Sequence, residues 1–305
     1  MNAIEVSGLS RAFGHLVAVD HLEFSVPRGE MFGIVGPDGA GKTTLMRILA
    51  GVLPPTGGDA RVAGVSVAQY PEAVKPHIAY MAQRFGLYDD LTVAENIHFY
   101  ADLYRVPKQA RPARIERLYA FSNLGEFRDR LAGNLSGGMK QKLSLSCALV
   151  HQPPVLLLDE PTFGVDPISR RDLWLILHEM VADGMTVVVS TSYLDEAERC
   201  DRVALLHNGR IIALDTPRAL QRSLPGTMLM VRTAEARRAR NVLEEHAGAG
   251  RAALFGNSIH VMIPAGGDTD VPARLLAEAG IAVESIEVAA PSLEDVFISL
   301  TGPQP

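Results

Sequence analysis

Short apolar runs alternate with longer amphipathic segments over the first two thirds of the chain. Residues 155–158 and 186–190 are apolar runs of strand length, as in the buried strands of a parallel sheet. Residues 168–182, between them, carry apolar positions at helical spacing. This alternation predicts an α/β domain with a mainly parallel central sheet and an antiparallel β flank. The expected strands are residues 4–6, 17–19, 22–26, 31–35, 155–158, 186–190 and 202–207, and the expected helices are residues 42–50, 91–104, 113–121, 138–150, 168–182 and 194–200.

The pattern changes around residues 216–226. Pro217, Pro225 and Gly226 interrupt the chain there, and a new alternation begins. We therefore expect two domains, residues 1–222 and a small C-terminal α+β domain over residues 227–302. The expected elements of the second domain are strands 228–232, 252–255, 258–263 and 283–288 and helices 234–246, 271–279 and 293–300.

Composition and charge exclude several classes of protein. Hydrophobic residues make up 47% of the 305 residues and charged residues 21%, which excludes a disordered chain. A formal net charge of −6 argues against nucleic acid as a partner. The apolar runs are shorter than the ~20 residues that cross a bilayer, and the first residues lack the pattern of an export signal. The sequence predicts a cytoplasmic protein, with Cys147 and Cys200 as buried free thiols.

A glycine-rich segment lies between an expected buried strand and an expected helix. Residues 36–43 read Gly-Pro-Asp-Gly-Ala-Gly-Lys-Thr, which fits G-x-x-x-x-G-K-[ST]. The backbone N–H groups of such a loop, with the helix N-terminus behind it, bind phosphate oxygens. We expect Lys42 to bridge the β- and γ-phosphates and the Thr43 hydroxyl to bind Mg²⁺. The nucleotide contacts expected here are Gly36, Pro37, Asp38, Gly39, Ala40, Gly41, Lys42, Thr43 and Thr44.

Two carboxylates end a second expected strand. Asp159 and Glu160 follow the apolar run of residues 155–158. Ligands gather at the carboxyl ends of parallel strands, so one of these carboxylates is expected beside the phosphate loop. Asp159 suits a place in the Mg²⁺ shell, and Glu160 suits activation of the attacking water. The two motifs together predict a nucleoside triphosphatase.

A third motif narrows the family. Residues 135–141 read Leu-Ser-Gly-Gly-Met-Lys-Gln, which resembles the LSGGQ signature of ATP-binding cassette (ABC) ATPases. The resemblance covers roughly residues 1–220. It implies an ABC-type nucleotide-binding domain of the P-loop NTPase fold, with a helical signature subdomain. The resemblance implies ATP contacts at Phe13, where the adenine stacks, and at Ser136, Gly137, Gly138 and Asp166. It implies catalytic roles for Glu160, Gln83 and Ser192. It implies Mg²⁺ ligands at Thr43, Gln83 and Asp159.

The same resemblance implies partners. In this family each ATP lies between the P-loop of one cassette and the signature of another, and closure of the dimer acts on separate membrane subunits. Residues 36–47, 131–142 and 190–198 look like the first cassette of YbhF-type tandem ATPases of multidrug ABC-2 exporters. The tail around residues 291–297 looks like the accessory C-terminal region of that type. The implied cofactors are ATP and Mg²⁺, and the implied partners are ABC-2 permeases and a second cassette, at the inner face of the cell membrane.

The sequence departs from the family at Ser192, where a switch histidine is usual. That histidine contacts the γ-phosphate and holds Glu160 and the attacking water, and we expect the serine hydroxyl to be too short for this. Loss of such a contact costs about 10²- to 10³-fold in rate. We favour pairing with a second cassette that carries the histidine. A slow homodimer, or replacement by Tyr193 or a water, is the other interpretation.

Two rival functions remain at this stage. One is a cassette that holds ATP, hardly turns over and serves a regulatory purpose, because Ser192 replaces the histidine. The other is a DNA-repair or ribosome-associated cassette, which the acidic net charge disfavours.

Two expectations concern residues near these motifs. Asp38 replaces the more usual asparagine of the loop, and we expect its carboxylate to face solvent, a partner subunit or a backbone N–H rather than phosphate. Phe85 and Tyr88 follow Gln83. In the family this region receives a coupling helix of the membrane subunit, so we expect Phe85 or Tyr88 to be a docking contact.

Overall fold

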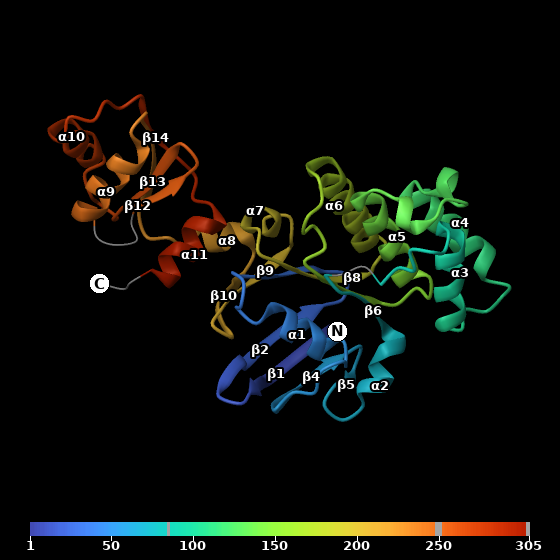
Figure 1. The fold of residues 1–305 in the computed structure, drawn as a ribbon. Helices are drawn as coiled ribbons and strands as arrows, with labels where there is room; N and C mark the ends of the chain where they lie inside the picture. The colour runs from blue at the N-terminus through green and yellow to red at the C-terminus, as the bar shows by residue number, and fades with distance from the viewer. Residues whose placement is uncertain (84–85, 248–251, 303–305) are drawn as a thin grey trace. The chain divides into compact units, whose positions relative to one another are not determined.

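The computed structural model describes residues 1–83, 86–247 and 252–302, which form two compact units (Figure 1). The first unit holds residues 1–193 and 199–211, and the second holds residues 194–198 and the chain from residue 212 onward. Phe85 therefore lies outside the described residues. The division into domains at residues 222 and 227 stays a prediction.

The central sheet of the first unit is mainly parallel, as predicted. Its strand order is β10-β9-β3-β8-β7-β6. Every residue of β3 (Met31–Val35), β7 (Val155–Asp159) and β8 (Thr186–Thr191) is buried, which explains their continuous apolar character. β6 spans Ile78–Met81, β9 spans Arg202–His207 and β10 spans Arg210–Asp215.

The register of the three buried strands places their carboxyl ends at one edge of the sheet. Val35 of β3 pairs with Thr191 of β8, and Asp159 of β7 pairs with Ser190 of β8. Residues that follow these strands therefore meet at the same edge, where ligands bind in open α/β sheets.

An antiparallel sheet in the order β2-β1-β4-β5 forms the flank. β1 (Asn2–Phe13) and β2 (Leu16–Pro27) pair as a hairpin of two 12-residue strands, longer than the three short strands predicted. Gly14 provides the left-handed conformation of its turn, with φ of 59°. β4 (Gly57–Val62), β5 (Val65–Ser66) and β6 were not predicted, because each is short and its polar and apolar positions do not form a long pattern.

Side-chain caps mark the start of some helices of the first unit. Thr92 and Glu95 form a capping box at α3 (Val93–Leu103), and Asp166 caps α6 (Pro167–Ala182). α4 (Arg111–Ser122) and α3 pack against α5 (Gly137–Leu149), and Figure 1 shows these three helices grouped together. The remaining helices of this unit are α1 (Lys42–Leu49) and α2 (Pro71–Val74).

The second unit is an α+β module, as predicted. Its sheet is antiparallel in the order β12-β13-β11-β14. Its core is built from apolar side chains that include Val231, Leu243, Ile259 and Leu276. The strands are β11 (Thr227–Arg232), β12 (Ala252–Phe255), β13 (Ser258–Ile263) and β14 (Ser285–Val288), and the helices are α7 (Leu194–Ala197), α8 (Pro217–Arg222), α9 (Ala236–Ala247), α10 (Val271–Glu278) and α11 (Leu293–Thr301).

The two cysteines lie in the interior, as expected. Cys147 and Cys200 are buried thiols that form no disulfide within the described residues, and burial raises the pKa of the Cys147 thiol, so this thiol stays protonated. Across the ranges that the structure describes, we find no helix with the length and apolar content of a membrane span.

Candidate functional site

The glycine-rich loop joins β3 to α1 at the carboxyl edge of the sheet, and its backbone needs glycine at two places. A Cβ at Gly36 would lie 2.1 Å from the carbonyl oxygen of Leu206, and a Cβ at Gly41 would lie 2.2 Å from that of Ala18. Gly41 also has φ of 107° and precedes α1 without a side-chain cap. The first N–H groups of α1 therefore have no side chain in front of them, as an anion site at a helix start requires.

Lys42 is the central cation of this site. It is 4% exposed, and its Nζ donates to the carbonyl oxygens of Gly36 at 2.7 Å and Pro37 at 3.1 Å. The same Nζ lies 3.1 Å from Glu160 Oε1 and 3.0 Å from Ser192 Oγ. Residues that follow β3, β7 and β8 therefore meet at one buried charge.

Asp159 gathers hydroxyl groups from three elements. Its Oδ1 accepts from Ser190 Oγ at 2.7 Å and from Thr43 Oγ1 at 3.1 Å, and its Oδ2 lies 3.4 Å from the Tyr80 hydroxyl. Burial, followed by the nearby Asp159 charge, raises the pKa of Tyr80 to about 12, so this phenol remains a donor. A buried carboxylate surrounded by hydroxyls is a set of hard oxygen ligands, and such a set fits Mg²⁺.

Glu160 leaves the strand in an unusual backbone conformation. Its φ is 50°, in the left-handed region that non-glycine residues rarely adopt. Its side chain is 13% exposed and meets the Lys42 ammonium on one oxygen, while Gln83 Nε2 donates to the other oxygen at 3.2 Å. The left-handed residue thus turns the carboxylate back toward the phosphate loop, within reach of Gln83.

Ser192 reaches further into this site than its short side chain led us to expect. Its Oγ lies 2.9 Å from Glu160 Oε1 and 3.2 Å from Asp38 Oδ1. Asp38 is exposed, which agrees with the expectation that its carboxylate faces solvent. The same carboxylate also contacts the Ser192 hydroxyl, a partner that the sequence did not predict.

The hollow in front of the loop has the size of a small-molecule site. It measures about 460 Å³, within the range of ligand pockets. Its lining includes Phe13 and Leu16 of the β1–β2 hairpin, together with Gln83, Glu160 and Phe163. Phe13 is 45% exposed, and the Arg11 guanidinium stacks 4.5 Å above its ring. An exposed aromatic ring at the rim is suited to stack on a base.

Ser136 starts α5, apart from the Lys42 cluster. Its Oγ accepts from the N–H of Met139 at 3.3 Å, so the hydroxyl proton remains available to a ligand. Gly138, the second glycine of the motif, packs so closely on α6 that a Cβ would lie 2.1 Å from Ser169 Oγ. The Oδ1 of Asp166 accepts from the N–H groups of Ile168 and Ser169, which lowers the pKa of the Asp166 carboxyl.

Comparison with known proteins places this geometry in a family. The "ABC transporter" family model matches residues 19–163. The daunorubicin/doxorubicin resistance ATP-binding protein DrrA of Streptomyces peucetius is 37% identical over 98% of this chain and 92% of its own. The chain belongs to the ABC transporter ATPases. The Nod factor export ATP-binding protein I of Mesorhizobium japonicum is 33% identical over 98% of this chain and 87% of its own.

Other relatives extend this picture. The probable multidrug ABC transporter ATP-binding protein YbhF of Escherichia coli K12 is 50% identical over 75% of this chain. That match spans only 40% of the length of YbhF. Among solved structures, an ATP-binding subunit of an ABC transporter aligns with a TM-score of 0.66 at 32% identity, over 72% of this chain and 92% of its own. These matches confirm the predicted family and the P-loop NTPase fold.

The predicted ABC site residues fall into two groups. The structure brings the phosphate-loop residues together with Asp159, Glu160, Gln83 and Ser192. Phe13 lines the same hollow. The signature residues Ser136, Gly137 and Gly138 do not line it, and neither does Asp166. Within this single cassette, the two halves of the predicted ATP site stay apart.

Three polar residues of the cassette were not singled out from the sequence. Ser190 contacts Asp159, and the buried amide of Gln141 donates to the carbonyl oxygen of Pro161. Asn96 is fully buried and bonds both the N–H and the carbonyl of Tyr88, each at 3.0 Å. Each partner is distant in the sequence or depends on a loop conformation, so only the fold shows it.

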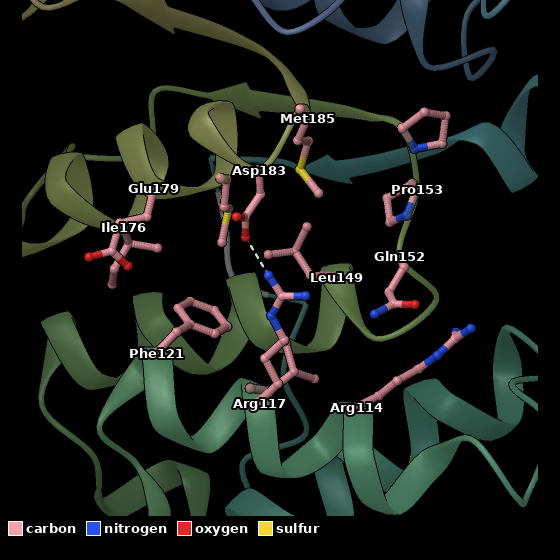
Figure 2. A pocket seen from close by; sticks show the side chains of 14 residues that line it. Arg114, Arg117, Phe121, Leu149, Gln152, Pro153, Ile176, Glu179, Asp183 and Met185 are labelled. Carbon is pink, nitrogen blue, oxygen red and sulfur yellow. Dashed lines mark hydrogen bonds and ion pairs between the residues drawn. The ribbon is translucent and has the colours of Figure 1, made fainter.

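A second hollow of this cassette, of about 330 Å³, holds none of the predicted site residues (Figure 2). It lies among α4, α5 and α6, and apolar side chains such as Phe121, Leu149 and Ile176 line it. Arg117 of α4 pairs there with Asp183 at the end of α6. Both side chains of this ion pair are largely exposed, so it contributes little to stability.

Proposed function

We propose that this chain binds and hydrolyses MgATP as the ATPase subunit of an ABC-2 type efflux transporter, and that it powers export through separate membrane subunits. One observation carries the proposal. The buried Lys42 ammonium lies within hydrogen-bond reach of two carbonyls of the phosphate loop and within 3.1 Å of Glu160. An ammonium held against a carboxylate at a phosphate loop is ready to exchange that partner for phosphate oxygens.

The arrangement supports a defined order of events. When the triphosphate enters, Lys42 exchanges Glu160 for the β- and γ-phosphate oxygens, and the carboxylate of Glu160 is released. Glu160 then accepts a proton from the attacking water as a general base, while Gln83, already hydrogen-bonded to it at 3.2 Å, orients the carboxylate and the water. The water oxygen bonds to the γ-phosphorus as the bond from that phosphorus to the bridging oxygen breaks, and ADP and phosphate are released. Thr43, Asp159 and Gln83 would hold Mg²⁺, which would neutralise charge on the phosphate oxygens.

The signature residues act on the ATP of a second cassette in this proposal. Ser136 and the first N–H groups of α5 form an anion site that does not line the chain's own loop hollow. A partner cassette that places its triphosphate there completes two ATP sites per dimer. Asp166 and Phe163 belong to the surface between the cassettes, and Phe163 is 59% exposed.

We favour a heterodimer. Ser192 bonds Glu160 but lacks the reach and the proton-carrying ring of histidine, so a site built with Ser192 turns over slowly. A partner with histidine makes the other site fast. The second candidate function, a cassette that mainly holds ATP, rests on this same observation.

The named relatives indicate the class of cargo. DrrA is a drug-resistance ATP-binding protein, and the Nod factor relative is an export ATP-binding protein. We therefore propose export of a bulky amphipathic molecule. The chain docks on the cytoplasmic side of its permease through the exposed rings of Tyr88 and Phe99, which meet edge to face with centroids 4.6 Å apart.

Phosphate release by the purified chain tests the proposal, with and without a candidate partner cassette. We expect Lys42→Ala to weaken ATP binding by about 10- to 100-fold, since a charged hydrogen bond contributes about 1.5–3 kcal/mol. In the chain without a partner cassette, Glu160→Gln should keep ATP binding and lose about 10²- to 10⁴-fold in turnover. Lys75→Ala, at an exposed lysine paired with Glu72, is the matched control.

Three outcomes separate the proposed functions. Absence of ATP binding by the unaltered chain contradicts both candidate functions. ATP binding without phosphate release, alone and with any partner cassette, supports the ATP-holding function instead. Phosphate release that Glu160→Gln abolishes supports the ATPase.

A further inference from the structure

Ser190 lies between the two acidic residues of the site and contacts both. It is the next-to-last residue of β8 and is fully buried. Its Oγ donates to Asp159 Oδ1 at 2.7 Å and accepts from the backbone N–H of Glu160 at 3.1 Å. A hydroxyl has one proton to donate and lone pairs to accept, so both bonds exist at once.

The position of Ser190 follows from strand register. Asp159 pairs with Ser190 across β7 and β8, at the point where β7 ends. The N–H of Glu160 also lies 3.1 Å from the carbonyl oxygen of Ser190. Ser190 thus contacts the side chain of Asp159 and the backbone N–H of Glu160, on either side of the peptide unit that leads into left-handed Glu160.

Of the three hydroxyls around Asp159, Ser190 makes the shortest bond. Thr43 lies 3.1 Å and Tyr80 lies 3.4 Å from the carboxylate. In the proposed function a lone pair of the Thr43 hydroxyl binds Mg²⁺ while its proton stays hydrogen-bonded to Asp159, so the position of Thr43 depends on the cation as well as on the carboxylate. Ser190 has no such second task, because it is buried away from the loop hollow.

We infer that Ser190 is a positioning residue of the MgATP site, one whose hydroxyl fixes the Asp159 carboxylate toward the cation and holds the Glu160 backbone in its left-handed turn. The inference rests on the proposed function. Partners of a metal ligand of this kind typically change metal affinity or activity by 10- to 100-fold when removed.

The test compares nucleotide binding with cation binding. For Ser190→Ala we expect ATP affinity in EDTA to stay within about twofold of the unaltered chain, since Lys42 and the loop are intact. We expect the affinity of the ADP-loaded protein for Mn²⁺, measured by electron paramagnetic resonance, to fall about 10-fold or more. Phosphate release should fall as well. Ser122→Ala is the matched control, because that hydroxyl is also buried and bonded, to Leu118, but lies on α4.

A second variant keeps the test decisive if Ser190→Ala does not fold. Ser190→Cys has nearly the same shape but only a weak donor, and we expect it to lose Mn²⁺ affinity in the same direction. Unchanged Mn²⁺ affinity in a folded Ala or Cys variant overturns the inference while the ATPase stands. Failure of the unaltered chain to bind ATP is instead a failure of the proposed function.

Discussion

Ser192 and Glu160 are directly hydrogen-bonded. The hydroxyl oxygen of Ser192 lies 2.9 Å from Oε1 of Glu160, the same carboxylate oxygen that contacts the Lys42 ammonium. The switch position therefore contacts the proposed general base in this chain, although the side chain is a serine. A serine in this place can orient the carboxylate, but it offers no ring nitrogen to the γ-phosphate.

We expect Ser192→His to raise the turnover of the chain by about 10²-fold, because it adds a transition-state contact that serine lacks. Single-turnover phosphate release measures this. Ser192→Asn is the control for added bulk and polarity, and it should not accelerate the reaction. Equal rates for Ser192→His and the unaltered chain would contradict the proposal that Ser192 limits the rate of hydrolysis.

The two glycines of the signature have different tasks. A Cβ at Gly138 would lie 2.1 Å from Ser169 Oγ and 2.5 Å from Ser169 Cβ, whereas nothing lies within 4 Å of a Cβ at Gly137. We expect Gly138→Ala to destabilise the protein by about 1–3 kcal/mol through overpacking, and Gly137→Ala to be close to neutral. Thermal unfolding measures both.

Ser169 supplies the internal check on this prediction. Gly138→Ala combined with Ser169→Gly removes the clashing side chain, so the double variant should regain part of the lost stability relative to the sum of the single changes. Additive losses, with no recovery, would show that Gly138 serves the backbone rather than the contact with α6.

His151 makes the stability of the first unit depend on pH. Its Nε2–H donates to the carbonyl oxygen of Ile78 at 2.9 Å, its ring stacks on Tyr104, and its Nδ1 is buried without a partner among the described residues. Burial lowers the pKa of His151 below its usual 6.5. The unfolded state therefore binds protons more readily, and the contribution present above pH 6.5 is lost as pH falls toward the lower, folded pKa.

We expect His151→Asn to flatten the fall in melting temperature between about pH 7.5 and pH 5.5. His98→Asn, at an exposed histidine of α3, should leave that fall unchanged. Parallel melting profiles for His151→Asn and the unaltered chain would mean that other groups set the pH dependence.

Tyr88 tests the coupling to the membrane. It is 48% exposed, and the buried Asn96 amide clamps its backbone. We expect Tyr88→Ala to lower permease-stimulated phosphate release and export while ATP affinity stays within about twofold, because the ring lies outside the loop hollow. Tyr70→Ala, at a tyrosine that is 62% exposed elsewhere, is the matched control. Unchanged export removes Tyr88 from the docking surface.

The sequence predicts an element of this fold well where a single local pattern is enough to identify that element. The buried strands β3, β7 and β8 are continuous apolar runs, and the loop before Lys42 has its own signature. The role of Ser190 was not predicted, because it depends on the pairing of Ser190 with Asp159 across β7 and β8, and no local sequence pattern encodes that pairing. The contact of Asp38 with Ser192 was not predicted for a similar reason, since the two residues are 154 positions apart in the sequence.

The central claim is that each ATP is bound jointly by the Lys42 loop of one cassette and the Ser136 end of another. Ser136→Asp keeps an oxygen acceptor at the start of α5 but places a carboxylate against the triphosphate. Lys42→Ala disables the loop of the same site. A mixed dimer of the two variants, formed by co-expressing them without the favoured partner cassette, contains one unaltered composite site and one that carries both changes.

The most direct measurement is therefore the amount of ATP retained by differently tagged, co-purified pairs of Lys42→Ala and Ser136→Asp chains. The account predicts ATP retention at close to one site per mixed pair, with little in either variant alone. The account would be contradicted if the mixed pairs retained as little ATP as either variant alone, or if the Ser136→Asp chain alone retained as much ATP as the unaltered chain.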